Sequence, residues 1–313
     1  GILHVHALGW EDRLQLLLDA GEWEESLAAA LELYERRAGS AASVGSHGHL
    51  QQEAISTRVA QMLLQYVAAA LPPPPAPAPE PEACERIGGV CVDFCVSIGR
   101  HDMLFGPIAA AFARWPAAER TLLALFEPYM LNGRLTHLSP PLLAAFARHC
   151  CAASGPDGAG LRRLEACLLA MDLARMPLPL VLRLCRRLRL HSALAAAHAA
   201  AAGDFGAPIA ELLARLPAPP PADAVGAPAA DDGDGGDDEL PPALPPPSGA
   251  ELEGVGYKLL LYLKYCFSCR AFPTGALPPA VLAAGRVQAC AYLYDDAHHA
   301  ARLAALLRID TPE

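Results

Sequence analysis

The strongest candidates for chemistry in this sequence, by residue type and spacing, are two cysteines. Cys266 and Cys269 form a CxxC pair. Such a pair supplies half of a tetrahedral zinc site, which needs a second pair of ligands at matching spacing. The nearest histidines, His298 and His299, are adjacent, so on a helix their side chains point about 100° apart. We therefore expect buried core thiols here, and we predict no metal ligands.

The other cysteines follow the same pattern. Cys91 and Cys95 are four residues apart, which places them on one helical face, and we expect Cys150 and Cys151 to be core thiols as well. Ten cysteines scattered along helical stripes do not form a disulfide framework. This usage favours a reducing, cytosolic setting.

No catalytic or cofactor motif is complete. The run Gly254-Val255-Gly256 lacks the third glycine and the preceding strand of a dinucleotide fingerprint, and there is neither a P-loop nor a nucleophile elbow. Asp102, at a predicted helix start, is interpreted as an N-cap. Pro128, in Glu127-Pro128-Tyr129, is expected to bend a helix rather than to mark a binding site. We predict no enzyme, no catalytic residue and no cofactor.

Six arginines cluster in the middle of the chain: Arg162, Arg163, Arg183, Arg186, Arg187 and Arg189. An RNA-binding helical repeat would carry such residues in every unit, whereas here they occur once. A solvated face is the favoured interpretation, and a protein-contact patch is the alternative. The net charge is −10, and nine acidic residues lie between Pro217 and Glu253. The remainder is nearly neutral, so no basic field suits nucleic acid or anionic lipid.

Short amphipathic helices must position these residues. Between Leu161 and Leu213, apolar residues recur at intervals of three and four, and Pro177 and Pro179 separate one helix from the next. Such helices cannot bury their apolar stripes alone, so they must stack in pairs. The sequence thus predicts an all-α fold, an α-solenoid of paired antiparallel helices of the clathrin or TPR type.

The same reasoning divides the chain into five parts. We expect N-terminal helical pairs over 1–71, a proline-rich linker over 72–82, a central α-solenoid over 83–216, a disordered acidic and proline-rich linker over 217–253, and a C-terminal helical segment over 254–313. No run approaches the roughly 20 apolar residues of a membrane span. No signal peptide is visible.

Several runs of mixed polar and apolar residues resemble the vacuolar protein sorting-associated protein 8 family. They are Trp10–Leu14, Leu125–Leu131, Leu164–Asp172, Val181–Cys185, Ala193-Leu194, Asp204-Phe205, Gly256–Cys266 and Arg270–Pro273. The resemblance implies a central α-solenoid of a CORVET subunit that tethers endosomal vesicles before fusion. It also implies class C core subunits as partners and a peripheral position on the endosome or vacuole membrane. The family's β-propeller, implicated in binding an early-endosomal Rab GTPase, and its RING module are not visible in this sequence.

We therefore predict a non-enzymatic scaffold for vesicle tethering and protein targeting to the vacuole or lysosome. One alternative is a clathrin-like coat or a general helical-repeat adaptor that binds protein partners. A second alternative, an all-helical enzyme such as a terpene-type synthase, needs Asp-rich metal motifs on helices. The acidic cluster from Asp231 to Glu239 lies among glycines and prolines instead.

Overall fold

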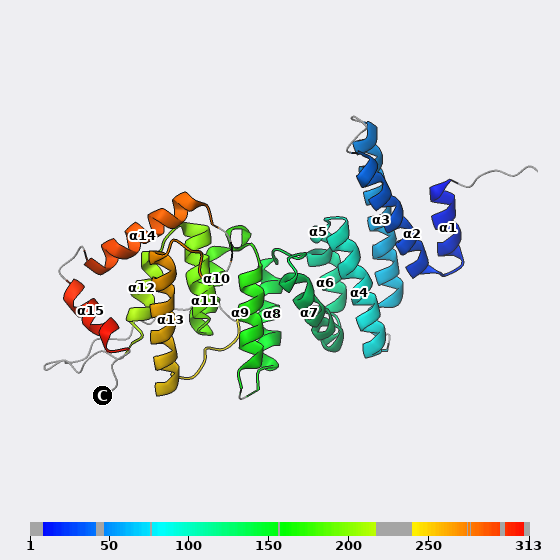
Figure 1. Ribbon diagram of the computed structural model, residues 1–313. Helices are drawn as coiled ribbons and strands as arrows, with labels where there is room; N and C mark the ends of the chain where they lie inside the picture. The colour runs from blue at the N-terminus through cyan, green and yellow to red at the C-terminus, as the bar shows by residue number, and fades with distance from the viewer. Residues whose placement is uncertain are drawn as a thin grey trace, which may run out of the picture. The chain divides into compact units, whose positions relative to one another are not determined.

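A computed structural model shows the fold of the chain (Figure 1). It describes residues 9–41, 47–75, 77–155, 157–216, 240–273, 275, 277–294 and 298–309. Within these ranges all regular secondary structure is helical, which confirms the predicted all-α class. The chain divides into two compact units, 1–129 and 130–313, so the boundary does not fall at either predicted linker.

The first unit consists of successive helices and helical turns. They are α1 (Trp10–Asp19), α2 (Trp23–Ala41), α3 (His47–Ala70), α4 (Pro81–Ser97), α5 (His101–Met103), η1 (Leu104–Ile108), α6 (Ala109–Phe112) and α7 (Pro116–Leu131), whose last residues pass the unit boundary. α1 packs on α2 and α2 on α3, as expected of neighbours along a solenoid. α7 continues through Pro128.

The α1–α2 hairpin shows how these pairs are held. Gly21 has a φ of 79°, a left-handed conformation that glycine adopts without steric cost, and it ends the first helix. Across the hairpin, the buried hydroxyl of Ser26 donates a hydrogen bond to the carbonyl of Leu14 at 3.2 Å. Leu14 and Leu27 are buried beside it. The polar group is therefore satisfied inside an apolar contact.

A carboxylate links the next helices of the first unit. Glu24 of α2 accepts a hydrogen bond from Tyr66 of α3 at 2.9 Å and forms an ion pair with Arg86 of α4 at 3.0 Å. The described residues between α3 and α4 form no regular helix, and α4 begins at Pro81, inside the predicted 72–82 linker. One side chain of α2 thus contacts the next two helices along the chain.

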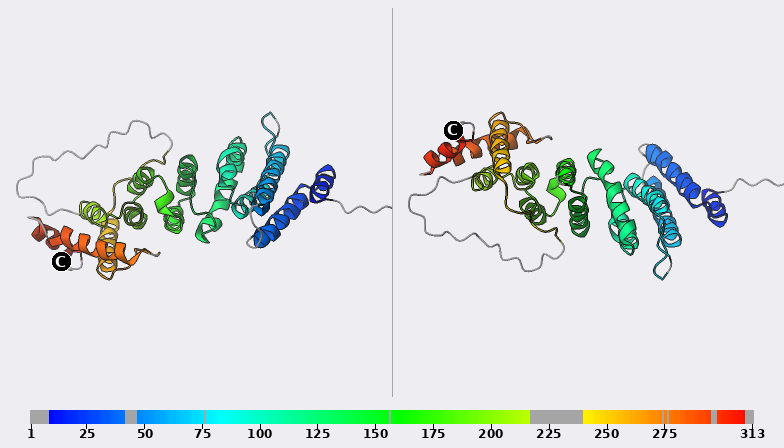
Figure 2. Two further views of the ribbon diagram at one scale, coloured as in Figure 1. Left: turned by 90° about the horizontal axis from the view of Figure 1, so that it is seen from above. Right: turned by 90° about the horizontal axis from the view of Figure 1, so that it is seen from below.

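The second unit continues the helical series. Its elements are α8 (Pro140–Ala152), α9 (Ala159–Ala170), η2 (Leu173–Arg175), α10 (Leu178–Arg187), α11 (His191–Ala197), η3 (His198–Ala202), α12 (Gly206–Leu213), α13 (Gly249–Phe267), α14 (Pro279–Tyr294) and α15 (His299–Leu307). Contacts pair α8 with α9 and α10 with α11, and the views in Figure 2 place α8 beside α9. The predicted row of short helices after Leu161 is therefore present.

The α8–α9 pair depends on a close backbone approach. A Cβ added at Gly160 would lie 2.1 Å from the carbonyl oxygen of Cys150 and 2.4 Å from the hydroxyl oxygen of Ser154. No side chain fits at such distances, so the pairing requires glycine at this position.

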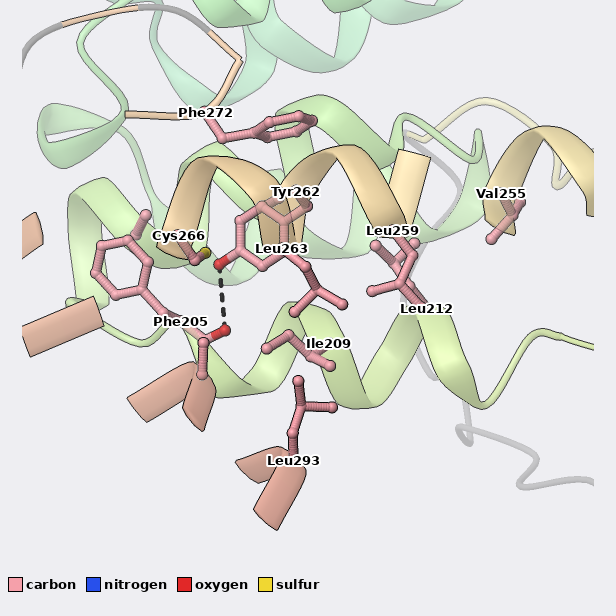
Figure 3. Packing of buried hydrophobic residues seen from close by; sticks show 13 residues of the cluster. Phe205, Ile209, Leu212, Val255, Leu259, Tyr262, Leu263, Cys266, Phe272 and Leu293 are labelled. Atoms are coloured by element: carbon pink, nitrogen blue, oxygen red, sulfur yellow. Dashed lines mark hydrogen bonds between the residues drawn. The ribbon is translucent and has the colours of Figure 1, made fainter. Parts of the chain in front are cut away.

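The hydrophobic core of the second unit combines helices that precede and follow the predicted acidic linker. Side chains from α11 to α14 form one cluster, in which Ala289 is fully buried. Ile209 and Leu259, also fully buried, lie in the same cluster (Figure 3). The hydroxyl of Tyr262 donates a hydrogen bond to the carbonyl of Phe205 at 3.2 Å. α13 therefore packs on α12 despite the intervening chain, and the helical stack continues.

The linker is shorter than predicted. α13 begins at Gly249 rather than after residue 253, because Ser248 and Glu251 form a reciprocal capping box at its start. Leu240 is only 7% exposed, so ordered packing resumes there. The predicted disorder of 217–239 lies outside the described residues. No helix among the described residues has the length and apolar character needed to cross a membrane.

Candidate functional site

The two CxxC cysteines differ in how deeply they are buried. Cys266 belongs to the core cluster, where burial raises the pKa of its thiol to about 11. Cys269 lies beyond the end of α13, with a φ of 50°, and is only partly buried, so it is not the core thiol that was predicted. Within the described ranges no three His, Cys, Asp or Glu side chains are grouped closely enough to hold a metal ion.

Other residues considered in the sequence take structural positions. Cys91, Cys95 and Cys150 are buried and belong to no disulfide, and burial raises the pKa of Cys95 to about 12. Cys151 is partly exposed. Asp102 is not an N-cap: it lies inside α5 and accepts two hydrogen bonds from Arg100, each 2.9 Å. The run from Gly254 to Gly256 lies inside α13 and forms no nucleotide-binding loop.

The arginine cluster divides between solvent and a pocket. Arg183 is exposed on α10, whereas Arg186 and Arg189 line a cavity of about 560 Å³ in the second unit. Arg215 follows α12, and Lys258 lies on α13; together they bring the number of cationic side chains in this cavity to four. The wall is completed by His191, Pro247, Glu251, Leu252, Gly254 and Val255. The prediction of a solvated arginine face is therefore wrong for Arg189, whose side chain is 17% exposed, whereas Arg186 stays 40% exposed.

An ion-pair network forms one side of this basic pocket. Arg186 donates to both carboxylate oxygens of Glu211, at 3.0 and 2.6 Å, and the Nε2 atom of His198 lies 3.3 Å from the same carboxylate. Burial alone would raise the pKa of Glu211, but the hydrogen bonds from Arg186 and His198 outweigh it and hold the pKa at about 2. The network ties α10 to α12 and η3, which fixes the position of Arg186.

A second carboxylate, Glu165, contacts two elements that line the pocket. Glu165 of α9 accepts hydrogen bonds from the backbone N–H groups of Ser192 and Ala193, at 2.7 and 3.3 Å. Its other oxygen lies 3.7 Å from the ammonium of Lys258. Glu165 thus satisfies the first turn of α11 and positions Lys258 beside the pocket.

Arg189 reaches the pocket from an unusual backbone position. Its φ is 54°, at the end of α10 where glycine is the preferred residue. The guanidinium donates to the carbonyl of Leu244 at 3.4 Å and lies 3.6 Å from the carboxylate of Glu251. These contacts hold residues 240–251 against the end of α10.

Two side chains that line the pocket, His191 and Arg215, have fewer compensating partners than the other cations and carboxylates there. His191 is 5% exposed, and its Nδ1 atom has no hydrogen-bond partner. Burial, together with the charges of Arg215, Lys258 and Arg189, lowers the pKa of His191 to about 4, so the imidazole is neutral at pH 7. For Arg215, burial is the main cause of a lowered pKa, and the neighbouring arginines contribute.

The chemistry this arrangement favours is binding of an anion. Guanidinium groups and a neutral imidazole N–H are donors suited to a carboxylate or phosphate oxygen.

Sequence reasoning found two of the arginines but missed His191, Arg215 and Lys258, which come from three further elements. The one available signal was Lys258, a charge that interrupts the apolar run of α13.

Comparison with known proteins gives the family. The family model described as the Vps8 central TPR matches residues 122–303. The chain is 24% identical over 272 residues to the vacuolar protein sorting-associated protein 8 homologs of Mus musculus and Homo sapiens. The match covers 86% of this chain and 17% of each relative, so the chain spans less than a fifth of their length. No solved structure matches. Because the family model covers more than half of the chain, the chain belongs to the Vps8 family.

Proposed function

We propose that this chain is a scaffold segment of a CORVET-like vesicle-tethering subunit that acts in endosomal fusion and in protein targeting to the vacuole or lysosome. The observation that carries the proposal is the match of residues 122–303 to the Vps8 central TPR. Stacked helices present extended surfaces to other proteins, which suits assembly rather than reaction.

The packing supports a role as one continuous platform within the second unit. The core cluster joins α12 to α13 and α14 across the acidic insertion, so the insertion does not separate the C-terminal helices from the rest of that unit. A scaffold must hold its binding faces in a fixed relation, and a shared apolar core provides that rigidity.

The partners follow from the same proposal. We expect class C core tethering subunits to bind the protein, and we expect it to reach the endosome or vacuole membrane peripherally, through the complex. An early-endosomal Rab GTPase is expected to be recognised through parts of the protein outside this chain. The proposal assigns no catalytic step and no nucleic-acid partner to the chain.

Affinity capture from cells tests the proposal. The tagged protein would be expressed in mammalian cells, and its partners would be identified by quantitative mass spectrometry. Class C core subunits should be enriched, and a variant with the core residue Leu259 changed to Asp should lose them. The exposed neighbour Leu261, changed to Asp, is the matched control and should keep them.

Two results would contradict the proposal. Capture without any class C subunit would remove the tethering assignment. Assembly of the purified protein into polymeric lattices, visible by electron microscopy, would favour the clathrin-like coat instead of a discrete complex.

A further inference from the structure

Most of the cationic side chains in the basic pocket already contact an oxygen of the protein. Arg186 is held by Glu211 through two hydrogen bonds, and Lys258 lies beside Glu165. Arg189 contacts Glu251 and the carbonyl of Leu244. These cations stabilise the pocket wall, and each has a neighbouring oxygen that offsets its charge.

Arg215 is different. Its guanidinium lines the cavity and is partly buried, and among the described residues it makes no hydrogen bond or ion pair. The nearest compensating charge is Glu211, whose carboxylate is already bonded to Arg186 and His198. A guanidinium has five N–H donors, so Arg215 retains the capacity to bind an incoming anion.

His191 supplies the second open group. The side chain is 5% exposed, yet its Nδ1 atom has no partner and the residue lines the same cavity. Buried polar atoms are nearly always hydrogen-bonded, so an unpartnered one beside a cavity indicates a missing acceptor or donor. A neutral ring that is protonated at Nδ1 has one N–H donor for such an acceptor.

The remaining walls limit what can enter. Pro247, Leu252 and Val255 line the cavity and provide an apolar surface beside the donors. A cavity of about 560 Å³ accepts one anionic group together with a neighbouring side chain. A lipid headgroup with several phosphates would need several uncommitted cations, and among the residues that the structure describes the pocket offers one, Arg215.

We propose that this pocket, between α10, α11, α12 and α13, binds a single carboxylate or phosphate monoester carried on an acidic peptide segment of a protein partner. Arg215 pairs with the anion, His191 donates a hydrogen bond to it, and the adjacent apolar residue of the peptide packs on Leu252 and Val255. The binding does not depend on the tethering proposal, because it follows from the charges and shape of the pocket alone.

Fluorescence anisotropy at pH 7 tests the proposal on the whole chain. The probe is a short labelled peptide with one glutamate or one phosphoserine flanked by leucine; the control peptide has glutamine or serine there. The acidic peptides should bind, and Arg215→Gln should weaken them about 10-fold or more, as expected for a lost charged hydrogen bond. Arg183→Gln removes the same charge from an exposed site on α10 and should change binding by less than about 2-fold.

NMR of histidine-labelled protein provides a readout that needs no variant. The ring resonances of His191 should move when the acidic peptide is added and stay in place with the neutral peptide. Equal weakening by Arg215→Gln and Arg183→Gln would overturn the proposal, as would unchanged His191 resonances. Binding of vesicles with anionic lipid that depends on Arg215, without peptide binding, would assign the pocket to a membrane and would also overturn it.

Discussion

The two halves of α13 use the same helix in different ways. Toward its C-terminal end, Leu259, Tyr262 and Cys266 enter the core cluster (Figure 3). Toward its N-terminal end, Glu251 and Lys258 line the basic pocket. The C-terminal half is apolar and closely packed, whereas the N-terminal half faces charges and a cavity.

The difference separates what stabilises the protein from what is available for binding. The core half buries side chains at helical spacing, so its contribution is the removal of apolar surface from water. The pocket half gathers charges whose partners come from α9, α10 and the segment before α13. Substitutions in the core half should therefore affect stability strongly, and those in the pocket half should affect it weakly.

The largest expected effect comes from truncating the core half. Leu259→Ala removes a fully buried side chain and should lower the free energy of unfolding by about 2–5 kcal/mol. Leu261→Ala, on the same helix with 44% exposure, should change it by less than about 0.5 kcal/mol. Urea unfolding followed by circular dichroism measures both. Equal costs would show that α13 does not pack as described.

The sequence predicted the helix of the core half but not its packing. It predicted a C-terminal helical segment over 254–313, but the Gly256–Cys266 run has apolar residues on every side of a helix, so the sequence did not identify the buried face. It also predicted the all-α class. Local patterns suffice for these features.

The pocket could not be predicted in the same way. His191, Arg215 and Lys258 are separated by tens of residues and meet only through tertiary packing. The start of α13 at Gly249 was also missed, although Ser248 and Glu251 form a capping box readable in the sequence. The proline-rich and acidic composition around it concealed that signal.

Two glycine substitutions give the second test. We expect opposite effects on stability in the core cluster and at the pocket. A Cβ at Gly285 of α14 would lie 2.7 Å from the ring of Phe205 in the core cluster, so Gly285→Ala should cost about 1–3 kcal/mol. Gly254 of α13 lines the pocket and has nothing within 4 Å of an added Cβ. Gly254→Ala should therefore stabilise the helix by about 1 kcal/mol. Thermal unfolding of the two variants measures the signs, and a stabilising Gly285→Ala would contradict the close contact.

The tyrosines of α13 sharpen the comparison further. Tyr262→Phe removes the buried hydroxyl that donates to Phe205 and leaves that carbonyl unpaired, which should cost about 1–2 kcal/mol. Tyr257→Phe, at a residue that is 56% exposed, is the matched control and should have almost no effect. Hydrogen exchange of the backbone amides in α12 and α13 would localise the loss. Faster exchange in both variants would indicate a general effect of the substitution rather than this hydrogen bond.

The smallest expected effect concerns pH and the ion pairs beside the pocket. The pKa of Glu211 is lowered to about 2, against burial, because Arg186 and His198 stabilise the carboxylate. Since the folded-state pKa is below the unfolded one, this group contributes stability above about pH 4.5 and loses it as the pH falls toward 2. Glu211→Gln should cost about 1 kcal/mol or less at pH 7, because Arg186 is partly exposed to solvent. The difference in unfolding free energy between wild type and Glu211→Gln should shrink on acidification.

An Arg186→Gln background provides the control. There the same substitution should show a weaker pH dependence. A constant difference between pH 7 and pH 3 would mean that the bond to Arg186 does not control the titration of Glu211.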